Sequence, residues 1–184
     1  MATRIALLRA VNVAGTRKLT MAALREFFDA IGADDVRTLL QSGNVVFDAD
    51  GGPAAWERTL EREAAARLGL DTQFFVRTAA EWRAVVAANP FPDAARTDPG
   101  HLLVLFLKDA PNRTQVQALR GAIVGREQVR TEGRHAYFMY PDGIGRSKLT
   151  GPLIERHLGT RGTGRNWNTV LKIAALAGAA TPAL

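Results

Sequence analysis

The stretch "NPFPDAARTDPGHLLVLFL" (89–107) divides the chain and indicates its fold class. Three prolines and a glycine interrupt regular structure over 89–100, and the run at 101–107 is the most apolar strand candidate in the sequence. We therefore expect a linker at 91–100. It would join a first α+β subdomain at 1–90 to a second at 101–184, and we expect the two to pack as one globular unit.

The residues before this stretch predict alternating strands and helices. Apolar residues at helical spacing follow Thr20, which is expected to cap the first helix, and Gly32 stands where that helix should stop. The expected elements are a strand at 4–13, a helix from Met21, a hairpin of 35–41 and 44–49, a helix opened by Pro53, a strand at 72–77 and a helix at 79–88.

The residues after it predict the same order again. The expected elements are a strand at 101–107, a helix at 113–121, a hairpin of 127–131 and 134–140, a helix at 151–158, a Gly-rich stretch at 159–165 that has room for a short strand, and a helix capped by Asn166. A short segment of sequence also repeats, since Val36-Arg37-Thr38 recurs as Val129-Arg130-Thr131. We predict an α+β fold of two related ferredoxin-like (βαββαβ) subdomains that arose by internal duplication.

Composition narrows the class of protein. The 184 residues contain no cysteine, which excludes a disulfide framework and thiolate chemistry. No apolar run is long enough to cross a membrane, and the N-terminal apolar run is interrupted by an arginine, unlike a signal peptide. We therefore expect a cytoplasmic protein with no membrane partner.

The net charge of +6 is unevenly distributed along the chain. Residues 1–25 hold five basic groups and no acid, and residues 144–184 hold six basic groups and one acid, whereas the middle of the chain is acidic overall. Such an asymmetry is typical of a binding face for an anionic partner. Arginine accounts for 20 of the 24 basic residues, so codon composition is the alternative explanation of the total charge.

Two similar hexapeptides lie at the basic ends, "GTRKLT" (15–20) and "GRSKLT" (145–150). Each predicts a Gly-containing loop that enters a helix capped by threonine. The free N–H groups of a helix start, with nearby cations, can bind a phosphate. Ordinary helix capping explains the same letters, and both interpretations stay open. The candidate anion-binding residues here are Arg17, Lys18, Arg146, Ser147 and Lys148.

The segment "GTRGTGRNWN" (159–168) is the second candidate. Its glycines permit close approach of the backbone to a ligand, Arg161 and Arg165 offer forked donors, and Asn166 starts a helix. Trp167 has helical spacing to apolar neighbours, which favours a place in the core over a platform for stacking bases.

The sequence gives little evidence for a metal site, a cofactor or a catalytic residue. The three histidines are isolated and lack metal-ligand spacing, so we expect no metal, and no cofactor motif is present. Asp142 and Glu155 are the only carboxylates near the C-terminal basic segment, and Asp142 lies in a turn-like "YPDG". No nucleophile–base pair is apparent, so no catalytic residue is assigned.

Several segments together resemble a bacterial family known as domain-of-unknown-function family 1697. They are "ALLRAVNVAGTRKLTMAALR", "VRTLLQSGNVVF", "VRTAAEW…ANPF", "YPDGIGRSKLT" and "GTGRNWNTVLKI", which occur in the order found in the family and extend over nearly the whole chain. Ala14 departs from the glycine that members often have there. The resemblance implies an α+β fold with two related subdomains, and it implies no activity and no catalytic residue.

Three classes of function remain. The first is binding of an anionic ligand, a phosphorylated small molecule or a nucleic acid, through the Gly-basic loops. The second is a small-molecule enzyme whose cleft lies between the subdomains, and the third is an interaction protein with no ligand site. The clustering of basic residues in Gly-bearing loops favours binding of an anionic ligand. The sequence does not indicate an oligomeric state.

Overall fold

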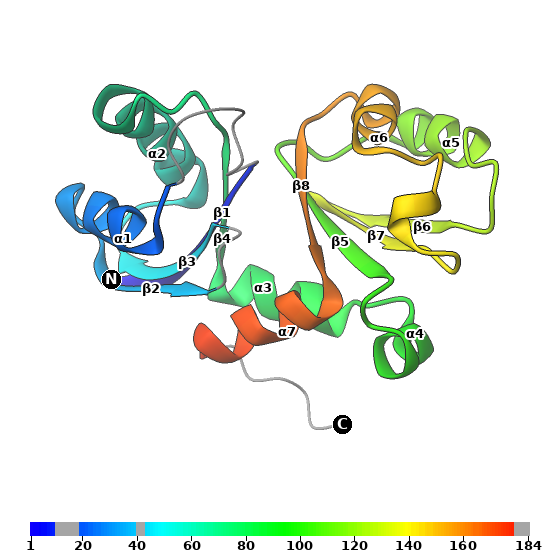
Figure 1. Ribbon diagram of the computed structural model, residues 1–184, viewed down its shortest axis with the longest axis horizontal. Helices are drawn as coiled ribbons and strands as arrows, with labels where there is room; N and C mark the ends of the chain where they lie inside the picture. Colours follow the sequence, from blue (N-terminus) through cyan, green and yellow to red (C-terminus); the bar gives the residue numbers. More distant parts are fainter. Residues whose placement is uncertain (10–18, 40–42, 179–184) are drawn as a thin grey trace. The chain divides into compact units, whose positions relative to one another are not determined.

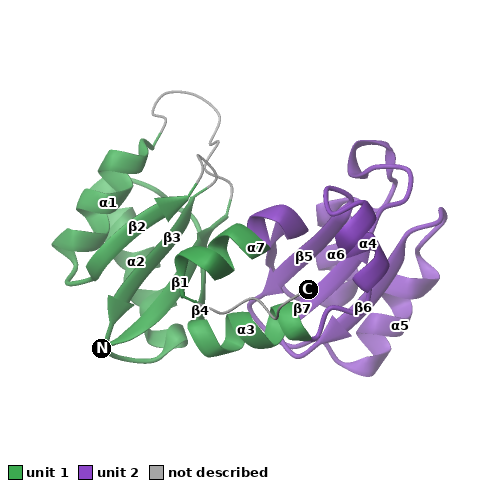
Figure 2. Ribbon diagram, turned by 90° about the horizontal axis from the view of Figure 1, so that it is seen from below, with its two compact units in different colours: residues 1–87, 171–184 green, residues 88–170 purple. Residues whose placement is uncertain are grey.

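The computed structural model describes residues 1–9, 19–39 and 43–178, which form two compact units. Unit 1 comprises residues 1–87 with 171–184, and unit 2 comprises residues 88–170 (Figure 2). Each unit has its own four-stranded antiparallel sheet, so the protein has a mixed α+β fold.

Unit 1 has the strand order β2-β3-β1-β4. Its elements are β1 (Ala2–Leu8), α1 (Met21–Ala30), β2 (Asp34–Leu39), β3 (Asn44–Ala49), α2 (Pro53–Leu68), β4 (Phe74–Thr78) and α3 (Ala79–Ala87). Helices α1 and α2 cover one face of the sheet (Figure 1). We call them the helical layer of unit 1.

Local chemistry explains the ends of these elements. The hydroxyl of Thr20 accepts a hydrogen bond from the N–H of Ala23 (3.1 Å), which confirms the predicted cap of α1. Pro53 occupies the first turn of α2, where its missing N–H costs nothing, and Gly69 ends that helix in the left-handed conformation (φ +63°). Thr78 precedes α3 in the same way, and its hydroxyl accepts from the N–H of Glu81 (3.0 Å).

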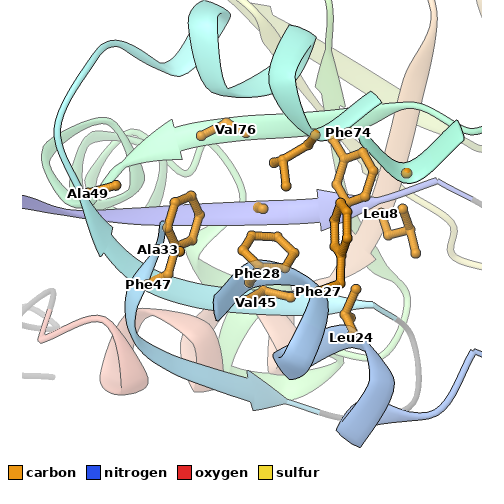
Figure 3. Packing of buried hydrophobic residues seen from close by; sticks show 13 residues of the cluster. Leu8, Leu24, Phe27, Phe28, Ala33, Val45, Phe47, Ala49, Phe74 and Val76 are labelled. Atoms are coloured by element: carbon orange, nitrogen blue, oxygen red, sulfur yellow. The ribbon is translucent and has the colours of Figure 1, made fainter. Parts of the chain in front are cut away.

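The core of unit 1 lies between its helical layer and its sheet. Figure 3 shows the rings of Phe27, Phe28 and Phe74 gathered beside β1, with Phe47 adjacent. All four side chains are buried. Because such rings bury large apolar areas, this cluster supplies much of the unit's stability.

Unit 2 has the order β6-β7-β5-β8, with helices again over one face of the sheet (Figure 1). Its elements are α4 (Pro92–Thr97), β5 (Leu102–Leu107), α5 (Arg113–Gly121), β6 (Gln128–Glu132), β7 (His135–Met139), the 3₁₀ turn η1 (Ile144–Arg146), α6 (Gly151–Leu158), β8 (Gly162–Asn166) and the start of α7 (Trp167–Leu176). Helices α5 and α6 are the helical layer of unit 2. They pack on a core that includes Leu107, Leu119 and Phe138.

Both units use glutamates of a helix to bond an edge strand. In unit 1, Glu57 and Glu61 of α2 accept hydrogen bonds from the N–H groups of Val76 (2.8 Å) and Phe74 (3.1 Å) in β4. In unit 2, Glu155 of α6 accepts from the N–H of Gly162 in β8 (3.0 Å). These carboxylates satisfy backbone donors that an edge strand would otherwise present to another chain.

The observed division differs from the predicted one at two places. The expected linker at 91–100 contains α4, since Pro92 suits a first helical turn, and it belongs to unit 2. Residues from 171 belong to unit 1, and one contact that joins them to it is the hydrogen bond from Arg37 Nη1 of β2 to the carbonyl of Leu176 (2.6 Å) at the end of α7. Strand β1 ends at Leu8, and 10–13 lie outside the described residues.

Within 1–9, 19–39 and 43–178, no helix is both long enough and apolar enough to cross a membrane.

Candidate functional site

The two Lys-Leu-Thr segments enter different helices. The first leads into α1, the first helix of the helical layer of unit 1, and the second into α6, the second helix of the helical layer of unit 2. Their positions in the two units therefore do not correspond. Arg17 and Lys18 lie outside the described residues, so the described part of the first segment is Leu19 and the capping Thr20.

The two threonines differ in their hydrogen bonds. Thr150 occupies the N-cap position of α6 with extended backbone, but its side chain makes no capping bond, unlike Thr20. Pro152 has no N–H, and the N–H groups of Gly151 and Leu153 bond no acceptor among the described residues. The start of α6 thus presents two backbone donors and a hydroxyl that are not engaged by the described part of the chain.

Cations precede this helix start. Arg146 and Lys148 are both exposed. Arg146 lies near Asp142, which is paired with Arg126. The hydrogen bond from Arg126 and the positive charge of Arg146 hold the pKa of Asp142 below its usual range. Asp142 is therefore the ion-pair partner of Arg126. Neither Arg146 nor Lys148 forms an ion pair with a described residue, and Arg146 has the carboxylate of Asp142 in its vicinity.

Ser147 holds the loop together. Its hydroxyl donates to Glu127 Oε1 and accepts from the N–H of Leu149 (2.9 Å). Both functions of the hydroxyl are in use, so Ser147 positions the loop more than it offers a ligand contact.

Tyr140 anchors the same loop from the core. Its hydroxyl donates to the carbonyl of Leu149 (3.4 Å), and its N–H donates to the carbonyl of His101 (3.0 Å). Burial of the phenol, with the negative charge of Glu127 nearby, raises the pKa of Tyr140 to about 12.

This shift predicts a loss of stability in alkali. The unfolded tyrosine has a pKa of about 10, so the folded state holds the proton more tightly. The resulting stabilisation is complete below pH 10 and is lost as the pH rises toward 12. We expect the free energy of unfolding of the wild type to fall by about 1.3 kcal/mol more than that of Tyr140→Phe between pH 9 and 11. Urea titrations at several pH values measure this difference, and parallel pH profiles of the two proteins would contradict it.

Arg161 lies apart from this helix start. It follows the C-terminal end of α6, a helix about 12 Å long, while Arg146 and Lys148 precede its N-terminal end. Its guanidinium lies 3.9 Å from Glu155. The proximity in sequence of "GRSKLT" and "GTRGTGR" therefore does not bring their cations to one end of α6.

Arg165 and Asn166 are engaged within unit 2. Arg165 is buried in β8 and donates to Thr163 Oγ1 (2.9 Å) and Gly164 O (2.8 Å), and burial lowers the pKa of Arg165 to about 10. Asn166 accepts from the N–H of Thr169 (2.9 Å), which confirms the predicted cap of α7. Trp167 is buried, as expected for a core residue.

The sequence reasoning missed one pair of titratable groups. His101 Nδ1 lies 2.8 Å from Asp98 Oδ2, and both side chains are more than two-fifths exposed. The pair closes a turn, in which the N–H of His101 donates to the carbonyl of Asp98 (3.1 Å). The segment "DPGH" (98–101) is the sequence feature that indicates this pair, because a Pro-Gly turn brings the residues on its two sides together.

Carboxylates and histidines, the common metal ligands, are dispersed over the described residues. Within the three described ranges, no group of three such side chains is placed to hold a metal ion. Glu155, one of the two carboxylates singled out from the sequence, is occupied by the backbone of Gly162.

Comparison with known proteins gives a family and a fold. The family described as "Protein of unknown function (DUF1697)" matches residues 1–137, which confirms the resemblance seen in the sequence. A conserved bacterial protein, SP0830 from Streptococcus pneumoniae, is similar in structure with a TM-score of 0.74. It is 23% identical, and the match covers 96% of this chain and 98% of that chain. No curated protein matches the sequence. At this identity the likeness concerns the fold.

Proposed function

The chain belongs to the DUF1697 family of proteins of unknown function, and we propose that its second unit binds an anionic, phosphorylated ligand at the start of α6. The ligand is a phosphorylated small molecule or a nucleic acid. The contacts assigned to it are the N–H groups of Gly151 and Leu153, the Thr150 hydroxyl and the Lys148 ammonium.

One observation carries this proposal. The threonine that precedes α1 caps its helix, whereas the threonine that precedes α6 leaves the helix start open. Backbone donors at a helix start, together with the positive end of the helix dipole, favour an oxyanion. Lys148 adds an unpaired positive charge immediately before the same helix. Arg161 and Arg165 have partners of their own and become secondary candidates.

A thermal-shift screen with pyrophosphate, nucleotides, sugar phosphates and carboxylates tests the proposal. A ligand present at 100 times its dissociation constant should stabilise the protein by about 2.7 kcal/mol. We expect Lys148→Ala to weaken binding of a hit about tenfold, because it removes a charge-assisted contact. Arg83→Ala, which removes an exposed cation from α3, should leave the affinity unchanged.

Thr150→Asp provides a second variant that separates ligand loss from misfolding. An aspartate at this position can cap α6 and complements the helix dipole, so we expect α6 to become more stable by about 0.5–1 kcal/mol. The same carboxylate should occupy the backbone donors, repel the ligand and abolish binding. A hit that binds wild type, Lys148→Ala and Thr150→Asp equally would show that the site is elsewhere.

A second candidate function, that of an enzyme, is favoured by the Asp98–His101 pair. A carboxylate at Nδ1 orients an imidazole so that Nε2 faces outward as an acid or base. Nε2 of His101 lies near Gly143 of the loop that precedes η1. A ligand from the screen that changes composition on incubation with the protein would favour this alternative.

We also propose that the two units are ferredoxin-like copies produced by internal duplication. Three features support this origin: the βαββαβ order with the inner strand pair in equivalent positions, the Val-Arg-Thr segments in β2 and β6, and the glutamates that bond β4 and β8. We further place the protein in the bacterial cytoplasm, as the absence of cysteine suggests.

A further inference from the structure

The helical layer of unit 2 and the loop before it carry exposed cations that are not paired. Arg113 and Arg120 lie on α5, Arg156 lies on α6, and Lys148 precedes α6. All four are exposed, and none of their side chains donates a hydrogen bond to, or forms an ion pair with, a described residue. Four charges left in water in this way are available to a partner.

The helical layer of unit 1 provides an internal comparison. Helices α1 and α2 carry four arginines and five carboxylates, whereas α5 and α6 carry three arginines and one carboxylate. In α2, Glu63 pairs with both Arg62 and Arg67. The carboxylate of α6, Glu155, is bonded to Gly162 and is mostly buried. Two layers of the same architecture thus differ in surface charge, and the difference favours an anionic partner for unit 2.

The spacing of these cations suits an extended polyanion. Arg113 and Arg120 are seven residues apart, which places them on one side of α5 about 10 Å from each other. Arg156 lies on the neighbouring helix of the layer (Figure 1). A single phosphate cannot contact donors this far apart, whereas successive phosphates of a nucleic acid can.

The apolar surface argues for a duplex over a single strand. Proteins that hold single strands stack bases on exposed aromatic rings. Among the described residues, the large apolar side chains that are exposed are Met1, Val124 and Ile144, and none is aromatic. A surface of cations without such rings fits the phosphate backbone of a double helix, which is bound without regard to sequence.

We propose that the helical layer of unit 2 binds duplex nucleic acid along its phosphate backbone, through Arg113, Arg120, Arg156 and Lys148. This inference rests on the proposed function, because the phosphate at the start of α6 becomes one phosphate of the duplex. A helix start with an adjacent lysine is a common contact to such a backbone.

Fluorescence anisotropy with a labelled 20-base-pair DNA and an RNA duplex of the same sequence tests the inference. Four phosphates neutralised by four cations should give a slope of about −3.6 in a plot of log affinity against log salt. Affinity should therefore fall about 150-fold between 50 and 200 mM salt. We expect the triple variant Arg113→Ala, Arg120→Ala, Arg156→Ala to reduce the steepness of that slope by about 2.7.

The matched control removes three arginines from the helical layer of unit 1. Arg58→Ala, Arg62→Ala, Arg67→Ala changes the net charge by the same amount, and we expect its slope and affinity to equal those of the wild type. Equal losses in both triple variants would overturn the inference, because general charge would then explain the binding. Binding of anionic phosphatidylserine vesicles with no binding of either duplex would also overturn it, in favour of a lipid surface.

The same measurements separate this inference from the proposed function. If neither duplex binds but pyrophosphate does, and if Lys148→Ala weakens that binding, the inference fails while the proposed function stands. If neither the duplexes nor any phosphorylated compound of the thermal-shift screen binds, both fail. A preference for one duplex over the other identifies which nucleic acid the surface takes.

Discussion

Replacing Phe28 with alanine is expected to lower the free energy of unfolding of unit 1 by about 3–5 kcal/mol. The side chain is fully buried, and its ring centre lies 5.7 Å from that of Phe27, 5.0 Å from that of Phe47 and 6.3 Å from that of Phe74. The substitution removes apolar area and leaves a cavity among rings that cannot all move inward. Hydrogen exchange of the amides of β1, which lies beneath this cluster, measures the loss.

Phe91→Ala is the matched control for this prediction. It deletes the same ring from a half-buried position in unit 2, where Arg130 lies 6.0 Å from the ring centre. Because Phe91 buries less apolar area and water can fill the space that its ring leaves, we expect less than half the loss in free energy of unfolding that Phe28→Ala causes. Hydrogen exchange of the amides of β5 measures this loss. Equal costs at the two positions would show that the cluster around Phe28 is not a close-packed core.

Most elements of the fold follow from local patterns in the sequence. Three such patterns are the apolar stripe after Thr20, the proline that begins α2 and the apolar run at 101–107. Each pattern predicts an element whose formation depends on residues that are neighbours in the sequence. The last helix shows the limit of such patterns. Its stripe predicts a helix, but the fact that its residues from Leu171 belong to unit 1 involves contacts between residues far apart in sequence, such as the bond from Arg37 to Leu176 across 139 positions. No local pattern reports that contact.

The stretch at 89–100 shows a second limit of local patterns. Its prolines and glycine predict a linker, and the structure has the short helix α4 within it, where Pro92 begins a helical turn and the Thr97 hydroxyl donates to the carbonyl of Asp93 (2.9 Å). Proline interrupts a helix in its interior and is tolerated at its start. The position of the proline within the segment, and not the number of prolines, decides the outcome.

The candidate site could be predicted in part. Gly-basic loops and helix starts are visible as letters, and α6 begins where "GRSKLT" ends. Whether a threonine caps its helix depends on the rotamer of its side chain, which the sequence does not determine. The two hexapeptides therefore predict the same cap for Thr20 and Thr150, although only Thr20 makes the capping hydrogen bond. The Gly-rich stretch at 159–165 predicts Arg165 as a ligand donor. As a strand residue in β8 it points to one face of the sheet and is buried there.

Glu57→Ala is expected to destabilise unit 1 by about 3–5 kcal/mol. Glu57 and Arg77 are both buried, and their charged atoms lie 3.5 Å apart. The substitution removes the negative charge next to a guanidinium that water cannot reach, and it also removes the acceptor of the Val76 N–H. Urea unfolding of the two proteins at neutral pH measures the difference.

Glu61→Ala separates the charge from the hydrogen bond. Glu61 lies one helical turn further along α2 and accepts from the N–H of Phe74 in the same edge strand, but it is less buried than Glu57. We expect its loss to cost about 1 kcal/mol, the usual contribution of one hydrogen bond. The double variant Glu57→Ala, Arg77→Met should recover part of the stability lost in Glu57→Ala, because the buried positive charge is then absent. If Glu57→Ala costs no more than Glu61→Ala, the carboxylate acts on the edge of β4 alone, and the charge of Arg77 is compensated by other groups.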